Sequence, residues 1–248
     1  MSIDFPLFVA IGFAAQLIDG AIGMAYGLIS TTVLLALGVT PPVASASVHA
    51  AEVVTTGVSA LSHWRFGNIN LRLFKRLAAG GVVGGALGAY LLVSAPAGVI
   101  RPLVSTYLLV MGSVVLWRSW RASRQPAREP KQIGLLGLTG GFLDAVGGGG
   151  WGSLVASTLV GRGADTRQAV GSTNAAEFLV ALTVSATFVA TIGLELWPII
   201  LGLIVGGVLA APFAAYMTSR LPDRILMTLV GVTIILLSLR ELLQLWIG

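Results

Sequence analysis

The residues best suited to chemistry gather around a run of glycines in the middle of the chain. Asp144 is followed by Gly147 to Gly150 and then by Trp151, within an otherwise apolar stretch. Each glycine disfavours a regular helix by roughly 1 kcal/mol, so the run predicts a break between two short helices, 132–143 and 151–160. In a bilayer, bare backbone is tolerated only where protein encloses it or where it lines a cavity. A broken apolar segment of this kind is typical of a transport site.

Polar and acidic side chains return in the segment that follows the break. Ser172, Thr173 and Asn174 precede Glu177, and the surrounding residues are largely apolar. Hydroxyl and amide groups donate hydrogen bonds without carrying charge, whereas an acid inside an apolar helix is costly and is by default functional. The group predicts either a ligand site or a set of buried hydrogen-bond partners.

The same order of residues occurs earlier in the chain. At a constant offset of 125 residues the matches include Asp19 with Asp144, Gly27 with Gly152, Ser47 with Ser172, His49 with Asn174, and Glu52 with Glu177. The chain is therefore predicted to be a duplicated unit, in which 19–27 is a degenerate copy of the glycine break.

The composition indicates where these elements reside. Of the 248 residues, 56% are hydrophobic and 10% are charged, against about 25% charged in soluble domains. We expect an all-α polytopic membrane protein that contacts the lipid bilayer. The net charge of +5 sits mostly in short loops, where it reports orientation rather than binding to nucleic acid.

Two repeats and a linker account for the whole chain. Repeat 1 is predicted at 1–120, a basic linker at 121–131 and repeat 2 at 132–248. Each repeat is expected to hold one broken helical pair and three spanning helices. The predicted pairs are 5–18 with 22–37 and 132–143 with 151–160; the predicted spanning helices are 43–62, 73–93, 101–117, 168–189, 197–217 and 224–246.

Loop charge predicts that the two repeats have opposite orientations. The loop 65–76 is basic, whereas its counterpart 191–201 contains no Lys or Arg. Opposite orientation requires an odd number of crossings per repeat, so we interpret each broken pair as a re-entrant hairpin and expect six crossings. The basic segment 118–131 is then cytoplasmic and both termini lie outside. An alternative with eight crossings would make the repeats parallel, against the loop charges.

The physics of the breaks favours an anion. A half-helix that starts at a glycine break presents free N–H groups and the positive end of its dipole, and two inverted copies would aim two such ends at one place. The predicted substrate-binding residues are Gly23, Tyr26, Ser47, His49, Gly147, Gly148, Gly149, Gly150, Trp151, Ser172, Thr173 and Asn174.

Four acids are predicted to act in coupling or in structure: Asp19, Glu52, Asp144 and Glu177. Asp19 and Asp144 fit either helix caps or residues that line the site. Glu52 and Glu177 fit either functional acids or protonated packing elements that hydrogen-bond the opposite break. His49 fits either a ligand or a structural donor.

The duplicated unit, Gly147 to Gly152 and the stretch Gly171-Ser172-Thr173-Asn174 resemble the TauE/SafE family of sulfite exporters. The resemblance covers nearly the whole chain. It implies a bacterial inner-membrane protein that exports sulfite or a related organosulfur anion from the cytoplasm. Alternating access around the two breaks would carry the anion across.

Other classes of function were weighed against this one. A cation/proton antiporter that uses the buried acids is the main alternative, although the helix N-termini would repel a cation. An enzyme is not expected, because the chain has no Cys, no His-Glu-x-x-His and no Gly-x-Ser-x-Gly. We expect no cofactor and no metal, since His49 and Glu52 form only a weak pair and the second copy has Asn174. The choice of anion, uniport or proton coupling, the direction and the oligomeric state stay open.

Overall fold

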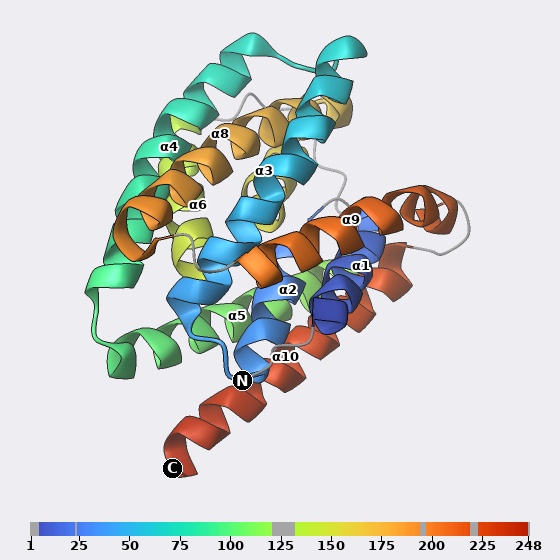
Figure 1. Cartoon of the computed structure of the whole chain (residues 1–248). Helices are drawn as coiled ribbons and strands as arrows, with labels where there is room; N and C mark the ends of the chain where they lie inside the picture. The colour runs from blue at the N-terminus through green and yellow to red at the C-terminus, as the bar shows by residue number, and fades with distance from the viewer. Residues whose placement is uncertain (1–4, 23, 121–131, 194–196, 219–222, 248) are drawn as a thin grey trace.

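The computed structural model describes residues 5–22, 24–120, 132–193, 197–218 and 223–247 (Figure 1). The first half forms α1 (Phe5–Ile22), α2 (Tyr26–Ala36), α3 (Pro41–Arg65), α4 (Leu71–Ser94) and α5 (Ala97–Trp120). The second half forms α6 (Ile133–Gly147), the π-helix η1 (Gly152–Ala156), α7 (Ser157–Gly161), α8 (Thr166–Ile192), α9 (Trp197–Thr218) and α10 (Asp223–Ile247). No strand occurs in these ranges, so the prediction of an all-helical chain is confirmed.

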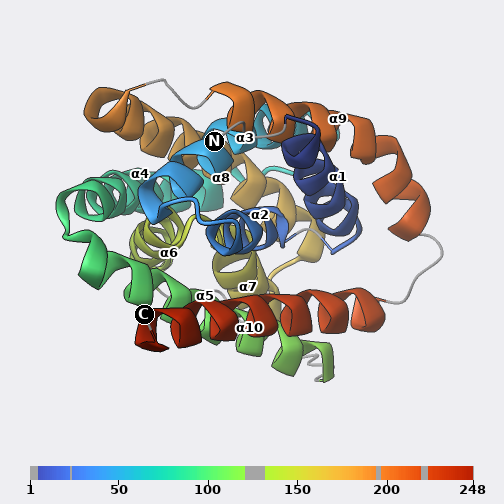
Figure 2. The same cartoon turned by 60° about the horizontal axis from the view of Figure 1, so that its bottom comes forward.

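The order of the helices repeats, and the two halves are interlocked. In order, α1 to α5 correspond to α6, η1 with α7, α8, α9 and α10. Each half packs its first helix against the fourth helix of the other half, so that α1 lies along α9 and α6 lies along α4 (Figure 1). The third helices pack together, as do the fifth helices α5 and α10 (Figure 2). The repeats therefore share one core; their opposite orientation in a membrane stays a prediction.

Glycines allow the exchanged helices to approach closely. A methyl group at Gly80 of α4 would overlap the carbonyl oxygen of Gly134 on α6. In the equivalent place of the other pair, a methyl group at Gly206 of α9 would overlap the carbonyl oxygen of Val9 on α1. Small residues that bring backbones together in this way are the usual device of membrane helix pairs. The glycines along α4 and α9 therefore serve helix packing.

Within the described ranges, four helices are long and apolar enough to span a membrane. They are 71–94, 97–120, 166–192 and 224–247, and they match four of the six predicted spanning helices. The other two predictions correspond to α3 and α9, of 25 and 22 residues. The halves of the broken pairs are shorter, at 18 and 11 residues for α1 and α2, which is about 27 and 16 Å at 1.5 Å per residue. Their re-entrant path stays a prediction.

The helix α5 is longer than the sequence pattern indicates. It runs from Ala97 through Trp120, whereas the predicted spanning helix covers 101–117; the predicted linker 121–131 lies outside the described residues. The guanidinium of Arg118 donates to the carbonyl oxygen of Ser153 in η1 and contacts the Ser157 hydroxyl. Near the other end of α5, Arg101 forms a 2.9 Å ion pair with Glu241 of α10.

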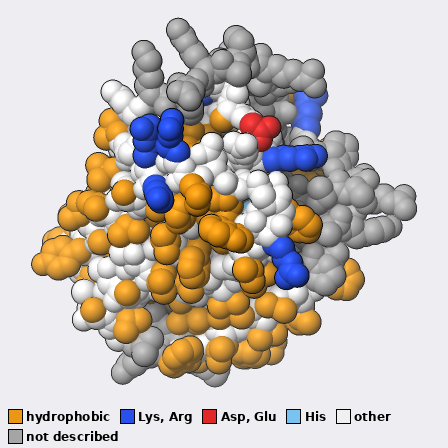
Figure 3. Space-filling view, turned by 90° about the horizontal axis from the view of Figure 1, so that it is seen from above, with side chains coloured by type: hydrophobic (Ala, Val, Ile, Leu, Met, Phe, Trp, Pro, Cys, Tyr) orange, Lys and Arg blue, Asp and Glu red, His pale blue; other side chains and the backbone are white. Residues whose placement is uncertain are grey.

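The surface agrees with a membrane environment. In the view from above, hydrophobic side chains cover much of the described face, and most Lys and Arg side chains lie in its upper half (Figure 3). Side chains such as Leu61, Val83 and Leu236 are more than half exposed, at 69%, 51% and 62%. Apolar exposure on this scale needs a covering, and a lipid bilayer supplies one.

The predicted inversion has a direct test, which the absence of cysteine makes simple. Single cysteines at Phe66, after α3, and at Thr191, near the end of α8, occupy exposed and corresponding positions of the two repeats. We expect a membrane-impermeant maleimide added outside intact cells to label only the Thr191→Cys variant, and to label Phe66→Cys after the membrane is permeabilised. Labelling of both variants from the same side would mean that the repeats are parallel.

Candidate functional site

The second glycine break has a backbone that only glycine adopts easily. Gly148, Gly149 and Gly150 have φ values of 69°, 144° and 130°, in the region that side chains with a Cβ rarely occupy. The helix α6 ends as the N–H of Gly149 donates to the carbonyl oxygen of Asp144 at 2.9 Å. Beyond the break, the N–H of Trp151 donates to the Asp144 carboxylate at 2.8 Å. Asp144 therefore caps the second half-helix from the end of the first.

The first break uses the same device with fewer glycines. One carboxylate oxygen of Asp19 accepts the N–H of Ala25 at 2.7 Å and that of Tyr26 at 3.0 Å. Tyr26 and Trp151 occupy equivalent places of the two repeats, and so do the two acids. Both acids act as helix caps, which was one of the two roles that the sequence left open. The caps also occupy N–H groups that were predicted to be free for an anion.

The two breaks meet in the interior. A methyl group at Gly27 would lie 2.6 Å from the Cα of Gly149. The Thr31 hydroxyl donates to the carbonyl oxygen of Gly148, and the Ser153 hydroxyl donates to that of Met24 at 2.7 Å. The predicted meeting of the two breaks is therefore present in the fold.

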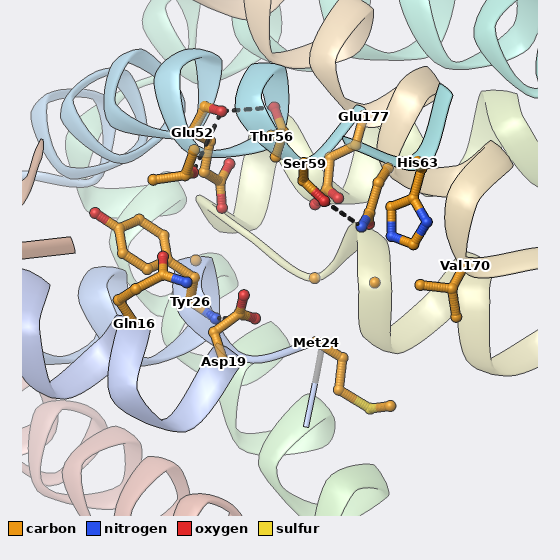
Figure 4. A pocket seen from close by; sticks show the side chains of 15 residues that line it. Gln16, Asp19, Met24, Tyr26, Glu52, Thr56, Ser59, His63, Val170 and Glu177 are labelled. Atoms are coloured by element: carbon orange, nitrogen blue, oxygen red, sulfur yellow. Dashed lines mark hydrogen bonds between the residues drawn. The ribbon is translucent and has the colours of Figure 1, made fainter. Parts of the chain in front are cut away.

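A cavity of about 280 Å³ lies beside this junction (Figure 4). Its lining comes from both breaks and from the facing helices α3 and α8. The lining residues are Gln16, Asp19, Met24, Tyr26, Gly27, Glu52, Thr55, Thr56, Ser59, His63, Gly150, Gly152, Val170, Asn174 and Glu177. The carboxyl groups of Asp19, Glu52 and Glu177 point toward this space from different elements (Figure 4). Among the residues that the structure describes, no Lys or Arg lines the cavity.

The cavity brings together six of the sixteen predicted site residues. Of the predicted binding residues it includes Tyr26, Gly150 and Asn174, and of the predicted acids Asp19, Glu52 and Glu177. The amide of Asn174 donates to the Ser59 hydroxyl at 2.8 Å across the gap between α8 and α3. The hydroxyl of Tyr26 donates to the carbonyl oxygen of Leu203 at 3.2 Å. Gly23 lies outside the described residues.

Several other predicted residues support the breaks and do not line the cavity. Gly147 packs against the ring of Tyr107, whose hydroxyl donates to the carbonyl oxygen of Gly149 at 3.0 Å. Gly148 and Gly149 fill the junction itself. Trp151 is fully buried, and its indole N–H donates to the carbonyl oxygen of Thr173 at 3.1 Å.

The predicted hydroxyl donors are used inside the protein. Ser47 donates to the carbonyl oxygen of Val43 at 2.8 Å in its own helix. Ser172 accepts the N–H of Asn70 at 2.9 Å and so fixes the turn that precedes α4. Thr173 donates to the carbonyl oxygen of Ala169 at 2.8 Å. These residues were predicted to bind the substrate, but helix carbonyls and a loop N–H occupy their hydroxyls instead.

His49 and Asp144 form a buried pair away from the cavity surface. The Nε2 atom of His49 lies 3.2 Å from a carboxylate oxygen of Asp144. The Nδ1 atom lies 2.8 Å from the carbonyl oxygen of Ser45. The predicted ligand role of His49 therefore gives way to the alternative, a buried hydrogen-bond partner that joins α3 to the glycine break.

Sequence reasoning missed the polar face of α3. Thr55, Thr56 and Ser59 follow Glu52 by three, four and seven residues, which places all four on one helical face. His63 continues this face and lines the cavity. Helical spacing from Glu52 was the signal that could have identified them.

This polar face has no counterpart in the second repeat. At the same offset, Thr55, Thr56 and Ser59 correspond to three buried apolar residues, Val180, Ala181 and Val184. Trp151 replaces Tyr26, and its ring reaches Gly81 of α4 beside Val180. The position equivalent to the cavity is thus packed with apolar side chains, so the duplicated fold is polar on one side only.

Comparisons with known proteins agree with this architecture. Residues 8–240 match the family described as "Sulfite exporter TauE/SafE". The chain is 42% identical over 252 residues to "Probable membrane transporter protein YtnM" of Bacillus subtilis (strain 168), with 98% of this chain and 84% of that protein covered. No solved structure matches. With its paired helix breaks, its apolar spanning helices and a match over almost its full length, the chain belongs to the TauE/SafE family of membrane transport proteins.

Proposed function

We propose that this protein exports a small sulfur oxyanion, sulfite or an organosulfonate, from the cytoplasm of a bacterium across its inner membrane. The family description names a sulfite exporter, and that description supports the substrate class and the direction. The observation that carries the proposal is the cavity beside the point where both helix breaks meet. Such a midpoint between two repeats is where transporters of this architecture bind substrate.

The cavity has room and donors for a small polar solute. At about 30 Å³ per water molecule, a volume of 280 Å³ holds a small oxyanion together with part of its hydration shell. Amide and hydroxyl groups of Gln16, Ser59 and Asn174 line it, whereas the hydroxyls of Thr55 and Thr56 donate to the carbonyl oxygen of Glu52 in their own helix. Neutral donors can replace water around an anion without fixing it too tightly for release.

Access is proposed to alternate as one repeat rocks against the other. The interlocked pairs α1 with α9 and α4 with α6 each pack one helix of each repeat on glycine-rich faces. Inverted repeats that rock about a central site are a common route to alternating access. In this arrangement the linker would be cytoplasmic and both termini periplasmic.

A cation/proton antiporter is the second candidate, and one observation favours it. Of the described side chains that line the cavity, three are carboxyl groups and none is Lys or Arg. In addition, Asp19 and Asp144 occupy N–H groups of both half-helices, so these helix ends repel a cation less than bare ends would. A Na⁺ or K⁺ ion would find oxygen ligands there.

Counterflow in proteoliposomes distinguishes the two candidates. Vesicles loaded with unlabelled sulfite or methanesulfonate are expected to take up the radiolabelled anion by exchange, without any imposed ion gradient. Replacing Asn174 by alanine removes one donor, worth about 1–1.5 kcal/mol, and is expected to slow exchange about tenfold.

Thr187→Ala is the matched control, because Thr187 lies on the same helix 13 residues further, about 20 Å along its axis. Its hydroxyl bonds only its own helix at Thr183 among the described contacts, so exchange is expected to stay within about twofold of the wild type. Exchange of Na⁺ or K⁺ for protons, with no counterflow of either anion, would contradict the proposal and establish the second candidate.

A further inference from the structure

The repeat places two equivalent groups of three polar residues on either side of the junction. The buried triad consists of His49, Glu52 and Asp144. The cavity triad consists of Asn174, Glu177 and Asp19, which all line the cavity. Because the halves are interlocked, each triad takes its aspartate from the opposite repeat. In residue type the two triads differ at one position, where the buried triad has the imidazole of His49 and the cavity triad has the amide of Asn174.

The geometry of the buried triad sets the positions of its protons. A carbonyl oxygen can only accept, so the contact of 2.8 Å between His49 Nδ1 and the carbonyl oxygen of Ser45 places a proton on Nδ1. One oxygen of Asp144 accepts the N–H of Trp151. The other oxygen faces His49 Nε2 at 3.2 Å, and two lone pairs at this distance would repel. One further proton therefore lies between them, on either atom.

Glu52 connects this proton to the cavity. Its carboxyl group lines the cavity, yet one of its oxygens is buried and has no hydrogen-bond partner among the described residues. One nitrogen or oxygen atom each from His49, Glu52 and Asp144 lies within 4.8 Å of the other two. Glu52 is only 4% exposed, and His49 and Asp144 are 0% and 1% exposed. A proton that leaves the buried pair can reach the cavity through Glu52.

The charges around the cavity tie this proton to an anion. The titratable groups that face the buried triad from neighbouring helices are Asp19 on α1, Tyr26 on α2, Tyr107 on α5 and Glu177 on α8. None of these four groups can carry a positive charge, and among the described residues that line the cavity only His63 is basic. Loss of the proton from the buried triad would leave one more negative charge near the site. Proton binding and anion binding should therefore favour each other.

We propose that the buried triad is the binding site of a coupling proton, so that the anion and one proton cross in the same direction. The inference rests on the proposed function, since it needs an anion in the cavity. Such coupling makes the transport of a monovalent anion electroneutral. An outward anion gradient drives export together with a proton, and an inward proton gradient opposes it, so both gradients set the direction.

The test uses methanesulfonate, which stays ionised throughout the pH range and cannot carry the proton itself. Proteoliposomes with equal K⁺ on both sides and valinomycin hold the membrane potential at zero. An imposed difference of one pH unit is expected to accumulate the anion about tenfold on the alkaline side, since one pH unit corresponds to about 1.36 kcal/mol per proton. A potential imposed at equal pH is expected to drive no accumulation.

Two variants locate the proton site. His49→Asn gives the buried triad the composition of the cavity triad, and Glu52→Gln keeps the shape of the side chain but blocks the path. Both are expected to lose accumulation driven by pH, and either one alone suffices if the other does not fold. His63→Asn removes the only other imidazole of the chain, and it is expected to keep the response to pH whatever its effect on the rate.

The outcomes separate this inference from the proposed function. Counterflow with no response to pH, but with a response to potential, overturns the coupling and leaves the permease in place. A response to a Na⁺ gradient in place of the pH gradient overturns the proton as the coupling ion, and an unchanged response in both triad variants overturns the site. Absence of counterflow overturns the proposed function and, with it, the coupling.

Discussion

Replacing Gly149 by alanine is expected to abolish transport and to destabilise the protein strongly. The φ of Gly149 is 144°, a conformation nearly restricted to glycine, so a side chain adds strain of about 1–3 kcal/mol. The new methyl group would also lie 2.7 Å from the backbone nitrogen of Leu28, in the other break. Overpacking of this kind costs about 1–3 kcal/mol. Together, the strain and the overpacking are expected to lower the free energy of unfolding measured in mild detergent. Vesicles that contain this variant are expected to show no counterflow.

Gly161→Ala is the matched control for this prediction. Gly161 ends α7, and a methyl group built there would have no neighbour within 4 Å. Alanine favours a helix by roughly 1 kcal/mol over glycine, so its stability is expected to be equal or slightly higher. If Gly149→Ala were as stable and as active as Gly161→Ala, the contact between the two breaks would not matter for function.

The duplication and the breaks could be predicted because few residue types can fill those positions. An acid that caps a half-helix from across a break needs a short carboxylate, so Asp19 and Asp144 recur at the same place and accept equivalent N–H groups. Consecutive glycines are needed where three successive φ values are positive. Because so few residue types meet these two requirements, the pattern can be recognised in a single sequence. The sequence does not predict η1, because a π-helix is rare and occurs mostly as a single turn within an α-helix.

The partners across the repeats could not be predicted from alignment of the two halves. The offset shows that Asp144 is equivalent to Asp19, but not that Asp144 pairs with His49 of the other repeat. Interlocking depends on helix packing, through glycines such as Gly80 and Gly206, and one sequence does not show which helices will meet. His49, Ser172 and Thr173 were therefore assigned to a binding site, where the structure gives them internal bonds.

The sequence contains the differences between the two repeats that make the site polar on one side, but it does not show that these differences concern a site. Ser59 in one repeat and Val184 in the other look like ordinary variation between copies. Only the fold shows that Ser59 lines the cavity and that Val184 packs in the interior. The same holds for Tyr26 and Trp151: one lines the cavity, and the other fills the equivalent position. The positions at which the two repeats differ therefore indicate the proposed site better than the positions at which they have the same residue.

Filling the cavity through this polar face is expected to stop transport while sparing the fold. In the Ser59→Trp variant, a large indole replaces a small side chain in a cavity of about 280 Å³ and breaks the bond from Asn174. We expect counterflow to fall by at least about tenfold, which corresponds to about 1.4 kcal/mol. The cavity offers room for the ring, so the melting temperature in detergent should change by less than about 4 °C.

Val58→Trp is the control variant, because Val58 is the adjacent residue on α3 and is 65% exposed on the outer surface. An indole there would contact lipid, and both stability and counterflow are expected to match the wild type. The pair of variants introduces the same ring on one helix, with only the direction of the side chain changed. An equal loss of counterflow in both variants would mean that any tryptophan on α3 disturbs transport. Full counterflow in Ser59→Trp would mean that the cavity does not lie on the transport path.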